Sequence, residues 1–456
     1  MRENLLTEYF LTLLVAAAFT YLLTPLVRRG AVRIGAMHAA RDRDVHVVPI
    51  PLLGGLAMYA GLAAGLYVAG RLAPLDSVFT APGTQGGLGM TGSLLLAGGL
   101  LVAVGCVDDR WGLNPLSKLA AQVAAGVIVY SGAQIPWLPQ PGGGTLSLSP
   151  NQSLALTVLV VVATINAINF IDGLDGLAAG IVCIGALSFF IYYYTLTGIV
   201  GLSAESGPAL ISVVLAGICI GFLPHNFYPA RIFMGDTGAM LLGLLLAYAV
   251  ISNFASIDPA VLAGHSAYAT RTVNRFPEVL PLLPPAAMLV IPYGDMLLAV
   301  VRRTRAGIPV FAPDRGHLHH RLLDIGHSHR SSVLIMYLWA GLFSGTVVWL
   351  SITKTPLFVF IVVTLAAVLA LLLMSMPRLR WWRRGAAPAA AADAALLPEA
   401  SRSPVLAAPT LPGPARGTEA SPAELPDAGA DHAESGRPTE SARSGTYSSW
   451  DLPWSR

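Results

Sequence analysis

Long apolar runs limit the folds open to this sequence more than any other feature. Eleven recur along the first 375 positions, and most are long enough, as helices, to cross about 30 Å of hydrocarbon. They are Tyr9–Val27, Leu52–Ala69, Thr91–Val107, Leu119–Tyr130, Leu154–Asn169, Ala178–Thr197, Ala209–Leu223, Ala239–Ile251, Val279–Val301, Val333–Leu350 and Leu357–Met374. Hydrophobic residues make up 54% of the chain and charged residues only 12%, which excludes an ordinary soluble protein. The sequence therefore predicts an all-α polytopic membrane protein, a bundle of about 11 transmembrane helices.

The loops between these runs predict how the chain is oriented. Lys and Arg gather in the loops of one side, from Arg28 and Arg29 after the first run to Arg302 and Arg303 after the ninth. The positive-inside rule assigns this side to the cytoplasm. We therefore expect a multi-pass protein of the cell membrane with its N-terminus outside and its C-terminus in the cytoplasm. The first run is too long for a signal peptide, so we expect it to stay in the mature protein.

The residues after the last run differ in composition from the rest. From about Gly385 the chain is rich in Ala, Pro, Ser, Gly and Glu and has few large apolar residues. Such a segment cannot bury enough surface to offset the entropy of ordering its chain. We therefore divide the chain into a transmembrane domain, residues 1–376, and a disordered cytoplasmic tail, residues 377–456.

Net charge and cysteine content argue against other classes of protein. A net charge of +3 is too small to predict a nucleic-acid partner. Cys106, Cys183 and Cys219 lie singly in three different apolar runs, so they predict neither a disulfide framework nor a zinc site.

Acidic residues and histidines gather on the side predicted to be cytoplasmic. They lie at the ends of the third and fifth runs, between the seventh and eighth, and between the ninth and tenth: Asp108, Asp109, Asp172, Asp175, Asp236, His317, His319 and His320. A carboxylate at membrane depth costs several kcal/mol unless it is paired, metal-bound or hydrated. These residues are therefore candidates for function.

Each motif also has a structural interpretation that stays open. Asp108 and Asp109 could be hydrated or cap the next helix, and Asp236 in GDTG could cap the eighth run. Asp172 and Asp175 are each followed by Gly, which is typical of a turn. The histidines lack the Glu of a zinc protease motif, so a hydrated loop is the simpler interpretation of that segment.

Together, however, the carboxylates predict a divalent cation. Neighbouring like charges repel one another, and a divalent cation relieves this repulsion. Hard oxygen ligands beside a phosphate suit Mg²⁺, with Mn²⁺ as the alternative, better than zinc. Lys118, one of only two lysines in the chain, and Arg315 supply positive charge for phosphate groups. We therefore expect a cytoplasmic active-site cleft that holds a metal and a phosphorylated substrate.

At these residues the sequence resembles the polyprenyl-phosphate N-acetylhexosamine-1-phosphate transferase family (glycosyltransferase family 4), whose members include the WecA-type and MraY-type membrane enzymes. Four motifs stand in the family's order: DDRWGL, NAINFIDGLDGLAAG, FMGDTG and PDRGHLHHRL. The resemblance covers nearly the whole membrane region and makes residues 1–376 the catalytic domain. It implies transfer of a sugar 1-phosphate from a UDP-sugar to a polyprenyl phosphate, with release of UMP and with Mg²⁺, at the cytoplasmic leaflet.

The resemblance also implies roles for individual residues. Asp236 is implied as the main Mg²⁺ ligand, with Asp172 beside it, while Asp108 and Asp109 are implied next to the lipid phosphate, one of them as a base. Asp172 and Asp175 are implied at the catalytic centre. The substrate-binding candidates are His46, Lys118, Asn169, Asn226, Arg315, His317, His319 and His320. In the first cytoplasmic loop, Asp44 stands where the family usually has a Lys two positions before His46, and Arg41 or Arg43 are the available substitutes.

The histidine motif favours one donor within the family. MraY-type enzymes carry three consecutive histidines, whereas Leu318 interrupts them here, as in enzymes that use UDP-N-acetylglucosamine (UDP-GlcNAc). We expect polyprenyl-diphosphate-GlcNAc as the product, the first step of a lipid-linked cell-envelope polysaccharide such as lipopolysaccharide or teichoic acid. The alternatives are a phospho-MurNAc-pentapeptide transferase or another UDP-HexNAc enzyme and, from a different class, a cation-coupled transporter. A homodimer is implied by the resemblance alone.

Overall fold

The computed structural model describes residues 2–38, 49–73, 75–80, 88–140, 145–200, 206–256, 283–305, 307 and 318–352, with a few positions between 358 and 369. The predicted tail, residues 377–456, and most of the eleventh predicted span, Leu357–Met374, lie outside this part of the chain.

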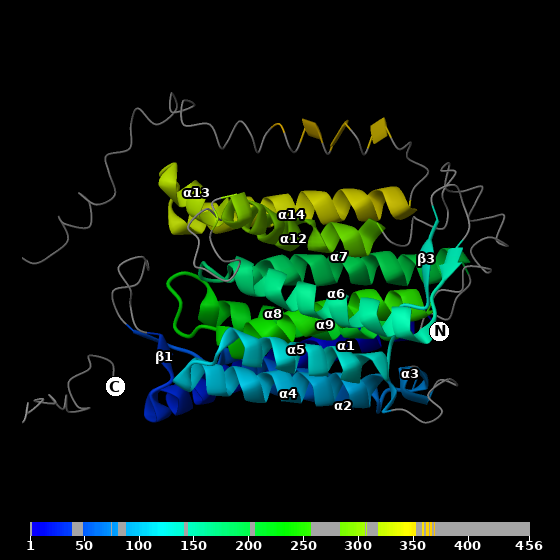
Figure 1. Cartoon of the computed structure of the whole chain (residues 1–456). Coiled ribbons are helices and arrows are strands. Elements are labelled where there is room, and N and C mark those ends of the chain that lie inside the picture. The colour runs from blue at the N-terminus through cyan, green and yellow to red at the C-terminus, as the bar shows by residue number, and fades with distance from the viewer. Residues whose placement is uncertain are drawn as a thin grey trace, which may run out of the picture. The chain divides into compact units, whose positions relative to one another are not determined.

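Helices form almost all of the regular structure in the described residues (Figure 1). They are α1 (Arg2–Ile34), α2 (Gly54–Ala69), α3 (Ser77–Thr80), α4 (Gly89–Trp111), α5 (Pro115–Tyr130), α6 (Pro150–Ile171), α7 (Leu177–Val200), α8 (Gly207–Asn226), α9 (Gly235–Ser256), α12 (Leu283–Arg305), α13 (Leu318–Asp324) and α14 (His329–Ile352). Two short antiparallel hairpins complete the structure: β1 (Met37–His38) with β2 (Ile50–Pro51), and β3 (Trp137–Pro139) with β4 (Thr145–Ser147).

The helices confirm an all-α polytopic membrane protein. Within the described residues, seven helices are long and apolar enough to cross a membrane: α1, α4, α6, α7, α8, α9 and α14. The shorter apolar helices α2 and α5 coincide with two further predicted spans. The total of about 11 crossings stays a prediction.

Local sequence signals fix where several of these helices begin. A polar capping residue followed by proline opens α5 at Asn114 and α6 at Ser149. The Asn114 side chain accepts a hydrogen bond from the Leu116 N–H at 3.0 Å, and Ser149 and Gln152 form a reciprocal capping box. Proline suits the first turn because its missing N–H would have no helical partner there.

Helix α9 is buried along almost its entire length, and glycines let its neighbours approach its N-terminal end closely. A Cβ atom on Gly55 of α2 would lie 2.3 Å from the Gly238 nitrogen, and one on Gly105 of α4 would lie 2.4 Å from the Thr237 Cα. Side chains cannot be accommodated at such distances. Gly55 and Gly105 therefore hold α2 and α4 directly against the start of α9, as small residues do in membrane helix packing.

The helices run side by side, with α13 and β1 near one end of the bundle and β3 near the opposite end (Figure 1). The ends of α4 and α6 and the starts of α5, α7 and α9 fall at the end marked by α13, because consecutive long helices alternate in direction. This arrangement gathers the DDRWGL, NFIDGLDG and FMGDTG motifs at one end.

Candidate active site

Three carboxylates meet where α4 ends and α9 begins. Asp108 and Asp109 lie in the last turn of α4, and Asp236 lies in the first turn of α9. One carboxylate oxygen from each lies within 4.8 Å of the others. Asp236 lies more than a hundred positions after Asp108 and Asp109 in the sequence, so tertiary packing creates the cluster.

Lys118 of α5 joins two of these carboxylates. Its Nζ donates to Asp108 Oδ2 at 2.9 Å and to Asp236 Oδ2 at 2.7 Å. The other Asp108 oxygen, Oδ1, accepts a hydrogen bond from the Leu113 N–H at 2.7 Å. One cation thus already stands between carboxylates of two different helices.

Asp109 caps helix α9 from a different helix. Its Oδ1 accepts from the Asp236 N–H at 2.8 Å, and its Oδ2 accepts from the Thr237 hydroxyl at 2.6 Å and, at 3.4 Å, from the Thr237 N–H. A carboxylate is favourable at a helix N-terminus because the orphan N–H groups and the helix dipole are positive there. Glycine at position 235 allows the Asp109 carboxylate to approach the start of α9. Gly235 has φ +68°, and a Cβ there would lie 2.1 Å from Asp109 Oδ2.

Asp172 is the least engaged carboxylate of the group. It ends α6, and its side chain makes no hydrogen bond with the residues that the structure describes. Burial in the surrounding protein, together with the negative charges of Asp236, Asp109 and Asp175, raises the pKa of Asp172 to about 8. Its surroundings therefore favour either a proton or a cation at this carboxylate.

Asp175 and Asn226 hold the backbone around the cluster. Asp175 is buried, and its Oδ2 accepts from the Ala230 N–H at 2.9 Å. Asn226, also buried at the end of α8, accepts from the Gly176 N–H and donates to the Ile232 carbonyl oxygen, both at 3.0 Å. These contacts join the turn after α6 to the loop between α8 and α9.

The other predicted site residues are placed less completely. Asn169 lies half-buried in the last turn of α6, and its side chain forms no hydrogen bond with other described residues. His319 and His320 lie in α13, but their side chains fall outside the described part of the structure. His46, Arg315 and His317 lie outside the described residues altogether, as does Asp44.

Sequence reasoning overlooked two residues near the cluster. Thr237 bonds Asp109 through its hydroxyl, and His329 accepts the Asp175 N–H at 3.0 Å. The sequence carried a signal for Thr237, because it follows Asp236 in the GDTG motif. His329 lies in the segment GHSH, and nothing in that segment predicts its role. Its contact with the Asp175 N–H is seen only in the structure.

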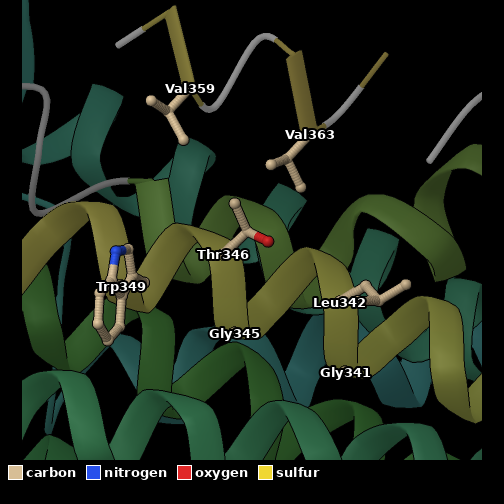
Figure 2. A pocket seen from close by; sticks show the side chains of 7 residues that line it. All are labelled: Gly341, Leu342, Gly345, Thr346, Trp349, Val359 and Val363. Atoms are coloured by element: carbon tan, nitrogen blue, oxygen red, sulfur yellow. The ribbon is translucent and has the colours of Figure 1, made fainter. Parts of the chain in front are cut away.

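An apolar pocket lies elsewhere, on α14 (Figure 2). Its lining consists of Gly341, Leu342, Gly345, Thr346, Trp349, Val359 and Val363. None of these side chains ionises, so the pocket offers no groups for acid, base or metal chemistry. The carboxylate cluster is the candidate active site.

The cluster is chemically suited to a divalent cation. Its donor atoms are carboxylate oxygens, which Mg²⁺ and Mn²⁺ prefer, and the three side chains are close enough to share one ion. The position of the Lys118 ammonium between Asp108 and Asp236 supports this fit, because a positive charge is already accommodated there.

The fold and this cluster define a polytopic α-helical membrane protein with a candidate cation-binding active site at one end of its bundle. Comparison with known proteins gives the family. The model of glycosyl transferase family 4 matches residues 91–253, which include the described carboxylates.

Relatives match over most of this chain. It is 44% identical to the decaprenyl-phosphate N-acetylglucosaminephosphotransferase of Mycolicibacterium smegmatis, over 74% of this chain and 80% of the relative. It is 31% identical to a probable undecaprenyl-phosphate N-acetylglucosaminyl 1-phosphate transferase of Bacillus subtilis, over 77% of this chain and 89% of the relative. The corresponding undecaprenyl-phosphate enzyme of Escherichia coli K12 is 25% identical over 72% of this chain. The chain belongs to glycosyl transferase family 4.

Proposed function

We propose that this protein transfers GlcNAc-1-phosphate from UDP-GlcNAc to a membrane polyprenyl phosphate, releasing UMP and forming polyprenyl-diphosphate-GlcNAc. The observation that carries this proposal is the cluster of Asp108, Asp109 and Asp236 around Lys118. Phosphoryl transfer needs mainly positioning and charge neutralisation, and the cluster offers ligands for a cation together with a cationic side chain.

The names of the relatives support GlcNAc as the sugar. The relatives cited above are named as N-acetylglucosamine phosphotransferases that use decaprenyl or undecaprenyl phosphate. The interrupted histidine motif of this chain agrees with that donor. A phospho-MurNAc-pentapeptide transferase is therefore not favoured, and neither is a cation-coupled transporter, whose relay would need carboxylates along the depth of the membrane.

A divalent cation, Mg²⁺ or Mn²⁺, would be held by Asp236, with Asp172 and the α4 carboxylates as further ligands. When bound, it would neutralise charge on the diphosphate of the donor. Lys118 would then be released from Asp236 to contact a phosphate. Asp109, whose oxygens bond the start of α9, keeps Asp236 in position.

The transfer balances as a single displacement. An oxygen of the polyprenyl phosphate attacks the sugar-linked phosphorus of UDP-GlcNAc, and a new P–O bond forms as the bond to the bridging oxygen breaks. UMP leaves with that electron pair. A covalent relay through an aspartate is the alternative, but a lipid phosphate is already largely ionised near neutral pH and gains little from it.

The proposal includes a location for the chemistry. The motif-bearing end of the bundle faces the cytoplasm, as the Lys and Arg of its loops predict, and a cleft there opens to the membrane so that the lipid phosphate can enter. About 11 helices cross the membrane, the N-terminus is outside, and residues 377–456 form a cytoplasmic tail. A homodimer is part of the proposal by resemblance alone.

A transfer assay tests this function. Purified protein in detergent is incubated with polyprenyl phosphate, Mg²⁺ and radiolabelled UDP-GlcNAc, and label is counted in the butanol-soluble lipid. We expect labelled lipid from the wild type, at least a hundredfold less from Asp236→Ala, and none when EDTA replaces Mg²⁺.

A matched substitution away from the cluster provides the control. Asp76, an exposed acidic residue that precedes α3, can be changed to Asn without touching the carboxylate cluster, and Asp76→Asn is expected to retain full activity. Labelled lipid from another UDP-sugar but not from UDP-GlcNAc would show that the proposed donor is wrong and identify the other UDP-sugar as the donor. If no UDP-sugar gives labelled lipid, the proposed transfer is wrong.

A further inference from the structure

His329, the first residue of α14, has no part in the proposed transfer, yet it contacts the turn that carries two of the site carboxylates. It is only 7% exposed. Its Nε2 accepts a hydrogen bond from the Asp175 N–H at 3.0 Å. Because the backbone N–H is the donor, Nε2 carries no proton, and the imidazole is the neutral tautomer with its proton on Nδ1.

Aromatic packing holds the His329 ring in this orientation. The ring stacks on Tyr228, in the loop after α8, with centroids 4.5 Å apart and planes inclined by 24°. The Arg330 guanidinium lies over the Tyr228 ring, 5.7 Å from its centroid. The nitrogen that accepts the Asp175 N–H is thus part of a packed, oriented ring.

Helix α14 also reaches the same turn at a second point. The Tyr337 hydroxyl, two helical turns beyond His329, donates to the Gly176 carbonyl oxygen. The Gly176 N–H in turn donates to Asn226 of α8. The backbone at Asp175 and Gly176 is therefore held from α8 and α14, and His329 is the contact closest to the start of α14.

A short connection joins α13 to His329 at the start of α14. Only residues 325–328 separate α13 from α14, and they form a tight turn in which the His327 N–H donates to the Leu322 carbonyl oxygen at 3.1 Å. Gly326 adopts φ +95°, which favours glycine, and Ser328 caps α14 by accepting from the Ser331 N–H at 3.2 Å. A short, hydrogen-bonded turn therefore joins α13 to the first residue of α14.

We propose that His329 is a positioning residue that couples α13, which carries His319 and His320, to the Asp172–Asp175 turn. It acts through the Asp175 backbone and touches neither substrate. The inference rests on the proposed function, in which α13 contributes to binding the donor and the Asp172–Asp175 turn contributes to the catalytic centre. Losing the His329 acceptor would keep every proposed metal-binding and substrate-binding residue. It would, however, loosen α13 relative to the Asp172–Asp175 turn.

Two substitutions separate the acceptor nitrogen from the packing of the ring. His329→Phe keeps a planar ring to stack on Tyr228 but offers no acceptor to the Asp175 N–H. His329→Gln loses the ring but presents a side-chain carbonyl oxygen at a similar reach. Arg330→Gln is the matched control, because Arg330 is the adjacent, exposed residue on the same aromatic pair.

The first measurement is amide hydrogen exchange of the peptide containing Asp175 and Gly176, in detergent and without substrate. We expect His329→Phe to exchange at least tenfold faster than wild type at this peptide, and His329→Gln and Arg330→Gln to stay within about threefold of it. Unchanged exchange in His329→Phe would overturn the coupling. This readout needs no activity, so it tests the His329–Asp175 contact on which the coupling depends even if the proposed transfer fails.

The second measurement separates donor binding from metal binding. In His329→Phe, the KM for UDP-GlcNAc is expected to rise about ten- to a hundredfold, by analogy with the loss seen when residues that orient metal ligands are mutated. Mn²⁺ affinity, measured by electron paramagnetic resonance, is expected to fall less than the KM rises, because three of the four proposed ligands, Asp108, Asp109 and Asp236, lie on α4 and α9 and only Asp172 lies on the turn. His329→Gln should recover most of the donor affinity. An equal loss of donor and Mn²⁺ affinity, or a Gln variant no better than Phe, would assign His329 a general structural role instead.

Discussion

Lys118 illustrates how one side chain organises an acidic site. Three carboxylates within 4.8 Å repel one another, and the Lys118 ammonium lies 2.9 Å from Asp108 and 2.7 Å from Asp236. A divalent cation that binds Asp236 must therefore replace a charge-assisted hydrogen bond as well as fill a space. Lys118 thus stabilises the cluster and would compete with a divalent cation for Asp236.

This competition predicts that Lys118→Met binds Mn²⁺ more tightly than the wild type. Breaking a hydrogen bond between charged groups costs about 1.5 kcal/mol or more, which corresponds to roughly a tenfold lower Kd once the competitor is removed. Electron paramagnetic resonance of Mn²⁺ titrated into the purified protein measures this directly. Lys118→Arg, which keeps the charge, should bind Mn²⁺ about as the wild type does.

The transfer rate of Lys118→Met is expected to change in the opposite direction. Lys118 is the proposed phosphate contact after the metal has bound, so tighter metal binding should accompany slower transfer. Weaker Mn²⁺ binding in Lys118→Met would contradict the competition and would make the lysine a simple support for the carboxylates.

At the residue scale, the sequence identified the carboxylates but not what they bond to. Asp108, Asp109 and Asp236 could be predicted to lie together because their motifs fall on one side of the membrane. The bonds from Asp109 to Asp236 and Thr237 could not, because they depend on how α4 packs against α9. The sequence left open whether Asp109 caps a helix or belongs to a functional site. In the structure it does both, because it caps α9 and lies in the carboxylate cluster.

At the scale of helices, the contact between α4 and α9 decides whether the cluster forms. Gly105 lies one turn before Asp109, and its backbone approaches Thr237 so closely that a Cβ would lie 2.4 Å from the Thr237 Cα. Any larger residue must push the two helices apart at the level of the carboxylates.

We therefore expect Gly105→Ala to lower both stability and transfer. Overpacking of this kind costs about 1–3 kcal/mol, and displacement of α4 would pull Asp109 away from the start of α9. Thermal unfolding in detergent and the transfer assay measure the two effects. Gly341→Ala on α14 is the matched control, because a Cβ at Gly341 meets nothing within 4 Å. Equal behaviour of the two variants would show that α4 does not rely on close approach to α9.

The helices themselves were largely predictable, and their ends were not. Long apolar runs predict helices reliably, because backbone N–H and C=O groups in lipid must form hydrogen bonds within their own segment. The predicted Tyr9–Val27 and Leu119–Tyr130 are, however, shorter than α1 (Arg2–Ile34) and α5 (Pro115–Tyr130). Polar residues and caps extend the helices beyond the hydrocarbon, where hydropathy gives no signal. The short hairpins β1–β2 and β3–β4 escaped prediction for the same reason.

At the scale of the whole molecule, the alternation of long helices explains why distant motifs converge. Helices α4, α6 and α8 end at the face where α5, α7 and α9 begin, so DDRWGL, NFIDGLDG and FMGDTG share one end of the bundle. Loop charges predicted this convergence before any packing was known. The proposed transfer also requires that this end of the bundle lie on the cytoplasmic side of the membrane, where UDP-GlcNAc is expected to bind.

Labelling of single introduced cysteines measures that orientation. Leu116, at the start of α5 beside the cluster, is 68% exposed, and Leu146 in β4, at the opposite end, is 48% exposed. In a background with Cys106, Cys183 and Cys219 replaced by Ala, a membrane-impermeant maleimide added to intact cells should label Leu146→Cys. It should label Leu116→Cys only after the membrane is permeabilised. The reverse pattern would place the carboxylates outside the cell, away from cytoplasmic UDP-GlcNAc, and the proposed transfer could not then take place at this cluster.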